Sequence, residues 1–338
     1  MSKIIYLIGA GASRGKRNES ISGLNKYSSG MPIVSEMSDY LGRYCQTFVS
    51  PIGISVNGHI SQHRSNYPRV HEELKWLLQV SKENPTLDTY AKKLFTRGPY
   101  EELARLKRAM AMWFTLIQSK EKRDMRYDSF MGAVVDNRGK MNSQISILSW
   151  NYDKQCEYAF HEYELNRTGT NHQFMYANIS CKGFTSQYIN TEDSNLVKLN
   201  GMAAFKPTHD HLLFEDSEYS LSYFEQMLTR DSINVENLIS YAWEEDDRFI
   251  EKILPLTEDT ETLIIIGYSL PRVNQSIDSR LINNMKNLKS IVIQDTDHQT
   301  VRTRLNDIIP DEKKELMNHI TVLDNVSEFY VPKLESAI

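Results

Sequence analysis

The chain has 338 residues, of which 40% are hydrophobic and 25% are charged, a composition that fits one large or two smaller globular domains and excludes disordered and fibrous classes. Its net charge of −5 provides no positive field for a phosphate backbone, so direct nucleic-acid binding is not expected. Three cysteines without a C-x-x-C pair exclude a disulfide framework and a four-cysteine zinc site. We expect a cytoplasmic protein without a membrane span, because the first apolar stretch, 4–8, is short and lacks a signal-peptide cleavage region.

Five short apolar runs predict buried strands, because they are almost continuously hydrophobic and rich in β-branched residues. They lie at 4–8, 145–148, 263–266, 291–293 and 320–323. Helical patterns at 275–286 and 301–309 precede the fourth and fifth runs. This alternation predicts βαβ units, and therefore an α/β fold built on a doubly wound (Rossmann-like) parallel sheet with helical insertions.

Helical periodicity dominates the long segment between the first two runs. Apolar residues recur there at helical spacing and predict a core stripe formed by Leu103, Leu106, Met110, Trp113, Phe114 and Ile117. We therefore expect a nucleotide-binding sheet domain made of 1–35 and 144–338, with an inserted helical layer at 36–143. A second helical excursion within the sheet domain is expected at 218–255.

The first predicted strand runs directly into Gly9-Ala10-Gly11-Ala12-Ser13. Glycines at such a strand-to-helix turn let the backbone approach a pyrophosphate, and the amides of the turn point at the anion. Position 14 is Arg, so the third glycine of the dehydrogenase fingerprint is missing. The turn favours dinucleotide binding, and a tight turn without a ligand is the alternative.

Further polar segments follow the ends of predicted strands, where ligands bind in open parallel sheets. Asn151 and Asp153 follow the second strand and can hold or orient a ribose hydroxyl or a water, although both residue types also cap helices. Gly267-Tyr268-Ser269 follows the third strand and can meet a phosphate or the adenosine. Asp295 ends the fourth strand and can either bind the adenine ribose or belong to a solvated turn. Gly30-Met31-Pro32 can fold over a cofactor or simply begin a helix.

Five of these stretches, in this order, resemble the motif set of the sirtuin-like NAD-consuming family, and especially its bacterial branch that acts in anti-phage defence. They are Gly9 to Ser13, Gly30-Met31-Pro32, Asn151-Tyr152-Asp153, Lys198-Leu199-Asn200-Gly201 and Gly267-Tyr268-Ser269-Leu270-Pro271. The resemblance implies that Asn151 is catalytic and that Asp153 closes the same motif. Together with the strand-end positions, it predicts NAD contacts from Gly9, Ala10, Gly11, Ala12, Ser13, Pro32, Asn151, Gly267, Tyr268, Ser269 and Asp295.

Asn200 departs from the family pattern, which usually has His at this position as general base for the ribose hydroxyl or the attacking water. An amide does not exchange a proton near neutral pH, so acid–base assistance of roughly 10²- to 10⁴-fold would be lost. Three explanations are open: an engineered inactivating change, which we favour, a natural pseudoenzyme that binds NAD without cleaving it, and a base supplied from elsewhere. His209 and His211 are the nearest candidates for such a base.

The resemblance predicts an NAD hydrolase that releases nicotinamide and ADP-ribose. Deacylating members use a four-cysteine zinc module that three cysteines cannot build, so we expect the water route and no zinc or other metal. The resemblance also implies an NAD-depleting effector of abortive infection, controlled by a separate sensor or activator protein, by homo-oligomerisation, or by both. Two alternatives are a silent subunit that senses NAD or ADP-ribose and a nicotinamide-dependent dehydrogenase, which the incomplete glycine pattern disfavours.

Overall fold

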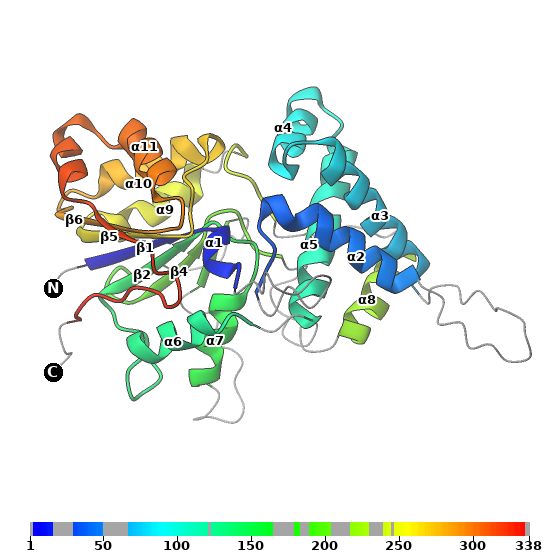
Figure 1. Ribbon diagram of the computed structural model, residues 1–338, viewed down its shortest axis with the longest axis horizontal. Helices are drawn as coiled ribbons and strands as arrows, with labels where there is room; N and C mark the ends of the chain where they lie inside the picture. Colours follow the sequence, from blue (N-terminus) through cyan, green and yellow to red (C-terminus); the bar gives the residue numbers. More distant parts are fainter. Residues whose placement is uncertain are drawn as a thin grey trace, which may run out of the picture.

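Seven parallel strands form a single sheet in the order β3-β4-β2-β1-β5-β6-β7 (Figure 1). The computed structural model of the chain describes residues 3–15, 30–49, 67–120, 123–164, 179–182, 189–203, 217–229, 239–244 and 247–334. The strands are β1 (Lys3–Ile8), β2 (Ile145–Ser149), β3 (Ile179–Cys181), β4 (Asn195–Lys198), β5 (Thr260–Ile266), β6 (Ser290–Gln294) and β7 (Thr321–Leu323). All five strands predicted from apolar runs are present, and β3 and β4 are additional.

The central strand, β1, pairs with β2 on one side and with β5 on the other, so that Ile5 lies opposite Ser146 and Leu263. From β1 the chain builds β2, β3 and β4 on one side of the sheet and later β5, β6 and β7 on the other. The strand order therefore reverses at β1. In open α/β sheets, the crevice outside the carboxyl ends of the strands at such a reversal is where ligands bind.

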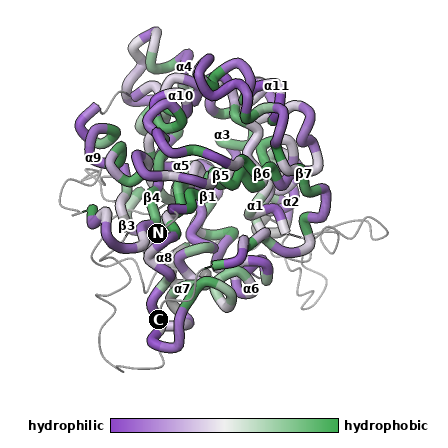
Figure 2. The backbone as a smooth tube through the Cα atoms, turned by 90° about the vertical axis from the view of Figure 1, so that its left-hand side faces the viewer, coloured by the Kyte–Doolittle hydropathy of each residue, from purple (hydrophilic) through white to green (hydrophobic). Residues whose placement is uncertain are grey.

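Helices cover both faces of the sheet, which makes the fold doubly wound (Figure 1). One face packs on α9 (Asp247–Thr257), α10 (Gln275–Asn284) and α11 (His298–Ile308). The other face packs on α6 (Met125–Val134) and α7 (Gln155–Glu164). Figure 2 shows the hydrophobic stretches of β5 and β6 enclosed by the surrounding helices. The strand sequences are hydrophobic on both sides because both sides are buried.

The remaining long helices form a helical lobe beside the sheet (Figure 1). Its members are α2 (Met37–Val49), α3 (Pro68–Glu83), α4 (Leu87–Arg97), α5 (Tyr100–Lys120) and α8 (Ser217–Thr229), and they share a hydrophobic core of their own. The predicted stripe of α5 belongs to this core, with Leu106 and Trp113 completely buried and Phe114 partly buried. The stripe is therefore core, as the helical spacing predicted.

The boundaries drawn from the sequence differ from this arrangement in two places. The predicted inserted layer, 36–143, includes α6, but Tyr127 and Phe130 of α6 pack against the sheet. The predicted excursion, 218–255, is divided, because α8 packs in the helical lobe whereas α9 packs on the sheet. Periodicity identifies a helix and its apolar face, but it does not identify the core that receives that face. Within the described part of the chain, no helix is long and apolar enough to cross a membrane.

Candidate functional site

The glycine turn after β1 leads into the short helix α1 (Ala10–Ser13) and lies against the end of β5. Gly9 donates its amide to the carbonyl of Ile266 at 3.1 Å, and Gly11 donates to the carbonyl of Gly267 at 2.8 Å. Gly267 has φ +56°, and a Cβ there would lie 2.1 Å from the nitrogen of Ala12. Glycine is required at position 267 because the backbone there is in direct contact with the backbone of Gly11 and Ala12. A phosphate at this turn would therefore meet amides other than those of Gly9 and Gly11.

Asn151 is fixed against the same turn. Its Nδ2 donates to the carbonyl of Gly9 at 2.9 Å and to Oγ of Ser13 at 3.0 Å, and the Ser13 hydroxyl is 2.9 Å from the hydroxyl of Tyr127. No described residue donates a hydrogen bond to the Asn151 Oδ1. The side chain is buried, so this oxygen is an oriented acceptor suited to a ribose hydroxyl or a water.

The Gly30-Met31-Pro32 loop lies directly on the end of α1. Met31 donates its amide to the carbonyl of Ser13 at 2.6 Å, and Pro32 is buried. Gly30 has φ +79°, and a Cβ at this position would lie 2.6 Å from the same Ser13 carbonyl oxygen. Two motifs separated in the sequence are thus in backbone contact.

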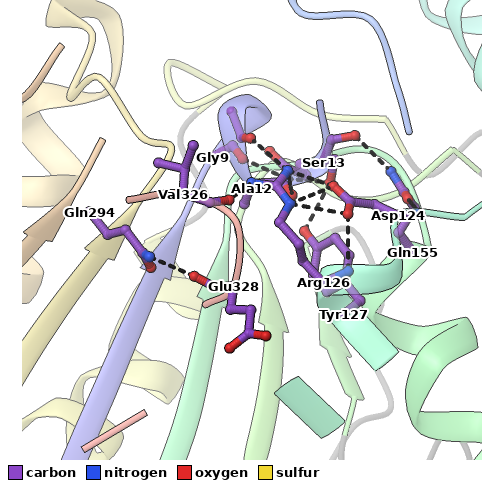
Figure 3. A network of polar contacts seen from close by, with 12 residues as sticks. Gly9, Ala12, Ser13, Asp124, Arg126, Tyr127, Gln155, Gln294, Val326 and Glu328 are labelled. Atoms are coloured by element: carbon purple, nitrogen blue, oxygen red, sulfur yellow. Dashed lines mark hydrogen bonds and ion pairs between the residues drawn. The ribbon is translucent and has the colours of Figure 1, made fainter. Parts of the chain in front are cut away.

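A buried polar network, which the sequence analysis missed, holds α1 from below (Figure 3). Arg126 pairs with Asp124 at 2.5 Å and donates to the carbonyl of Ala12 at 3.0 Å. Gln155 donates to the carbonyl of Ser13 at 3.0 Å and accepts from the amide of Asp124 at 2.7 Å. These side chains satisfy carbonyls at the end of a one-turn helix, so they fix the turn that carries Ser13.

The backbone carbonyl of Asp153 contacts a buried ion pair. Lys198, at the end of β4, is 3.0 Å from Oε1 of Glu157 in α7 and donates to the backbone carbonyl of Asp153 at 2.5 Å. The Asp153 carboxyl accepts from the amide of Gln155 at 3.1 Å, so it caps the start of α7. Burial raises the pKa of Asp153, and the charge of Lys198 opposes the shift. The capping use predicted for this residue type is present.

Asn200 follows β4 and lies in a turn that continues into Gly201, with φ +76°. Its backbone carbonyl accepts from the amide of Ser240 at 2.8 Å. Its side-chain Oδ1 is buried and has no hydrogen-bond partner among the described residues. Leaving a buried amide oxygen without a partner costs about 1 to 3 kcal/mol of stability. Such an unsatisfied acceptor is typical of a site where a bound ligand donates the missing hydrogen bond. His209 and His211 lie outside the described residues.

Tyr268 belongs to a buried cluster behind the crevice. Its ring stacks on Trp150, with 6.0 Å between centroids, and both side chains donate to Asp278, Tyr268 at 2.8 Å and Trp150 at 3.1 Å. Asn274 donates to the Tyr268 hydroxyl at 3.0 Å. The hydroxyl is therefore satisfied inside the protein, and only the ring faces the glycine turn. Ser269, by contrast, is exposed.

Asp278 should make stability depend on pH. Burial raises the pKa of this carboxyl to about 7, against the lowering effect of the hydrogen bonds from Tyr268 and Trp150. In the unfolded chain the pKa is about 3.9, so the stabilising contribution is complete below that pH and is lost as pH rises through about 7. Asp278→Asn removes this titration. We expect its free energy of unfolding, relative to the unmodified chain, to increase by about 2 to 4 kcal/mol from pH 4 to pH 8.

Urea unfolding of both chains across that range measures the effect. A difference between the two chains that stays constant with pH would contradict it.

Asp295 lies at the end of β6, and its carboxyl accepts from the amide of Asp297 at 2.7 Å. Asp297 in turn caps α11. Of the two roles predicted for Asp295, the structure therefore shows the one in a turn. Among the described residues, no hydrogen bond or ion pair joins Asp295 to the glycine turn, whereas Asn151 contacts Ser13 and Gly267 contacts Gly11 of that turn.

Cys45, Cys156 and Cys181 are buried, and none of them forms a disulfide. Across the described ranges, no group of three His, Cys, Asp or Glu side chains is arranged to hold a metal ion. Comparison with models of protein families finds no match, and comparison with curated proteins finds no significant match.

Proposed function

We propose that this crevice binds NAD and that the chain is an NAD glycohydrolase, which cleaves NAD to nicotinamide and ADP-ribose. The contacts among Ser13, Met31, Asn151 and Gly267 support this function most strongly. These residues come from four stretches that resemble the sirtuin-like motif set, and they meet where the strand order of a parallel sheet reverses. The Lys198 stretch joins them through its contact with the Asp153 carbonyl.

Cleavage of the bond between nicotinamide and ribose expels a neutral base, so the leaving group needs no proton. The site must orient the sugar, stabilise positive charge that develops on it and position a water. The Oδ1 of Asn151 is an oriented acceptor for a ribose hydroxyl or the water. Asp153, two residues further along the same segment after β2, adds a buried carboxyl.

Asn200 is expected to impair this activity in the chain as it stands, because an amide does not act as a base. The Oδ1 of Asn200, which has no hydrogen-bond partner among the described residues, also favours a second candidate, a catalytically silent subunit that senses NAD or ADP-ribose. By the resemblance, the active form is a cytoplasmic NAD-depleting effector in anti-phage defence. A sensor or activator protein, or self-association, would restrain it.

Asn151→Ala tests the assignment of the site. We expect it to lower the rate of nicotinamide release by at least about 100-fold in a chain that carries Asn200→His, because an oriented polar group at the reacting sugar is lost. Asn287→Ala is a matched control, since Asn287 is exposed and lies in the turn between α10 and β6. Chromatography of nicotinamide and calorimetry of NAD binding measure the two steps. Equal rates for Asn151→Ala and Asn287→Ala would contradict the site.

A further inference from the structure

The segment 325–330, which follows β7, is fastened to the carboxyl end of the sheet by one buried side chain. This side chain is that of Gln294, which ends β6 next to β5. Its Nε2 donates to the carbonyls of Asn325 at 2.7 Å and of Glu328 at 2.6 Å, and its Oε1 accepts from the amide of Tyr330 at 2.9 Å. Gln294 therefore holds three points of a segment that has no regular secondary structure.

Phe329 links the same segment to the crevice. Its ring is buried and packs edge to face on the rings of Tyr127 and Phe130 of α6, with 5.0 Å and 6.0 Å between centroids. The Tyr127 hydroxyl is 2.9 Å from the hydroxyl of Ser13, which in turn accepts from Nδ2 of Asn151. Only two side chains therefore separate Phe329 from Asn151.

Arg126 makes a second and more direct connection (Figure 3). Its Nη1 donates to the carbonyl of Val326 at 3.0 Å, and its Nη2 donates to the carbonyl of Ala12 at 3.0 Å. The same guanidinium is paired with Asp124 and lies 5.0 Å from the centre of the Phe329 ring. A planar guanidinium has five donors in fixed directions, so it can hold both carbonyls while it remains paired with the carboxylate. One side chain thus joins α1 to the segment 325–330.

Asn151 depends on α1 for its orientation. α1 has only four residues, so its own hydrogen bonds do little to fix it, and the contacts at its ends decide where it lies. The two hydrogen bonds of the Asn151 amide go to the Ser13 hydroxyl at the end of α1 and to the Gly9 carbonyl before it. A shift of α1 would therefore turn the Asn151 Oδ1, and a misplacement of about 1 Å can cost roughly 100-fold in rate.

We propose that Arg126 is a positioning residue that orients Asn151 through α1, and that the segment 325–330 holds Arg126 in the place this requires. The inference rests on the proposed NAD glycohydrolase function. In this role Arg126 does not touch NAD, and it acts through the Ala12 carbonyl on the turn that carries Ser13. The segment 325–330 contains none of the five motifs, yet it becomes part of the framework of the site.

Arg126→Lys keeps the charge that pairs with Asp124, but one ammonium group cannot replace the fork that holds two carbonyls. In a chain that carries Asn200→His, we expect kcat for nicotinamide release to fall by at least about tenfold and KM for NAD to change by less than about threefold. Arg302→Lys is the matched control, because Arg302 of α11 donates to the carbonyl of Met317 at 2.9 Å. It should leave both constants unchanged.

Gln294→Met tests the part played by the segment 325–330. The change removes the three hydrogen bonds of the side chain with little change in its size, so we expect kcat to fall by at least about fivefold in the same Asn200→His background. Asn284→Leu is the control, since Asn284 of α10 donates to the carbonyl of Leu254 at 2.7 Å. If Gln294→Met and Asn284→Leu give equal kcat, the segment does not hold Arg126 in place.

A double-mutant comparison separates positioning from a general loss of stability. Asn151→Ala removes the group through which Arg126 acts, so adding Arg126→Lys to it should lower the remaining rate by less than about threefold. A merely structural role would lower the rate equally with and without Asn151. If Arg126→Lys does not fold, as judged by circular dichroism, the same comparison is made with Gln294→Met.

The possible failures are distinguishable. If the Asn200→His chain is active and Arg126→Lys behaves like Arg302→Lys, or lowers the rate equally with and without Asn151, Arg126 is not a positioning residue and the proposed function stands. If the Asn200→His chain releases no nicotinamide before any further change, the proposed function fails and this inference fails with it.

Discussion

Asn200→His is expected to raise the rate of nicotinamide release from NAD by roughly 100-fold. The change introduces an imidazole, whose usual pKa is near 6.5, in place of a buried amide oxygen that no described residue hydrogen-bonds. The expected gain is at the lower end of the range for acid–base catalysis. NAD affinity should change little, since a base acts mainly in the transition state.

Asn200→Gln is the matched control for this change. It alters the size of the side chain but adds no base, so its rate should stay at or below that of the unmodified chain. Initial rates of nicotinamide formation give the comparison. Equal rates for the histidine and glutamine variants would show that position 200 does not carry the base.

Lys198→Met is expected to lower the free energy of unfolding by about 3 to 5 kcal/mol. Lys198 and Glu157 are both almost completely buried, so removing the lysine leaves an uncompensated carboxylate in the core. Burial alone would lower the pKa of Lys198, but Glu157 and Asp153 raise it above its usual value, so the lysine is charged in the native state. Urea unfolding at neutral pH measures the loss.

Lys140→Met is the control for Lys198→Met. Lys140 is paired with Asp193 at 3.1 Å but is largely exposed, and such pairs contribute within about 1 kcal/mol. Adding Glu157→Leu to Lys198→Met should recover part of the lost stability, because it removes the unpaired charge. Equal losses for Lys198→Met and Lys140→Met would show that the buried pair is not critical.

The sheet could be predicted from sequence because strands buried on both faces must be apolar along their whole length. β5 and β6 are examples, and their predicted positions agree with the structure to within a few residues. β4 was not predicted because it is only four residues long and ends in a lysine. Its Lys198 is buried only because Glu157, 41 residues earlier in the chain, neutralises it, and no local pattern reports such a partner.

Part of the site was predictable for a related reason. Parallel strands bring their carboxyl ends to one edge, so polar residues after strands, such as Ser13 and Asn151, were expected to meet. Arg126 was not predicted. It lies on a helix whose sequence reads as an ordinary amphipathic segment, and its importance arises from its tertiary contact with α1.

The most direct test of NAD hydrolysis in this crevice is product analysis in water labelled with heavy oxygen. NAD is incubated with the unmodified chain and with the Asn200→His variant. The products are then separated, and their masses are measured by mass spectrometry. We expect equal amounts of nicotinamide and ADP-ribose, with one labelled oxygen in ADP-ribose and none in nicotinamide, and faster formation with Asn200→His. Recovery of intact NAD from both chains, or release of nicotinamide without label in the sugar product, would contradict hydrolysis at this site.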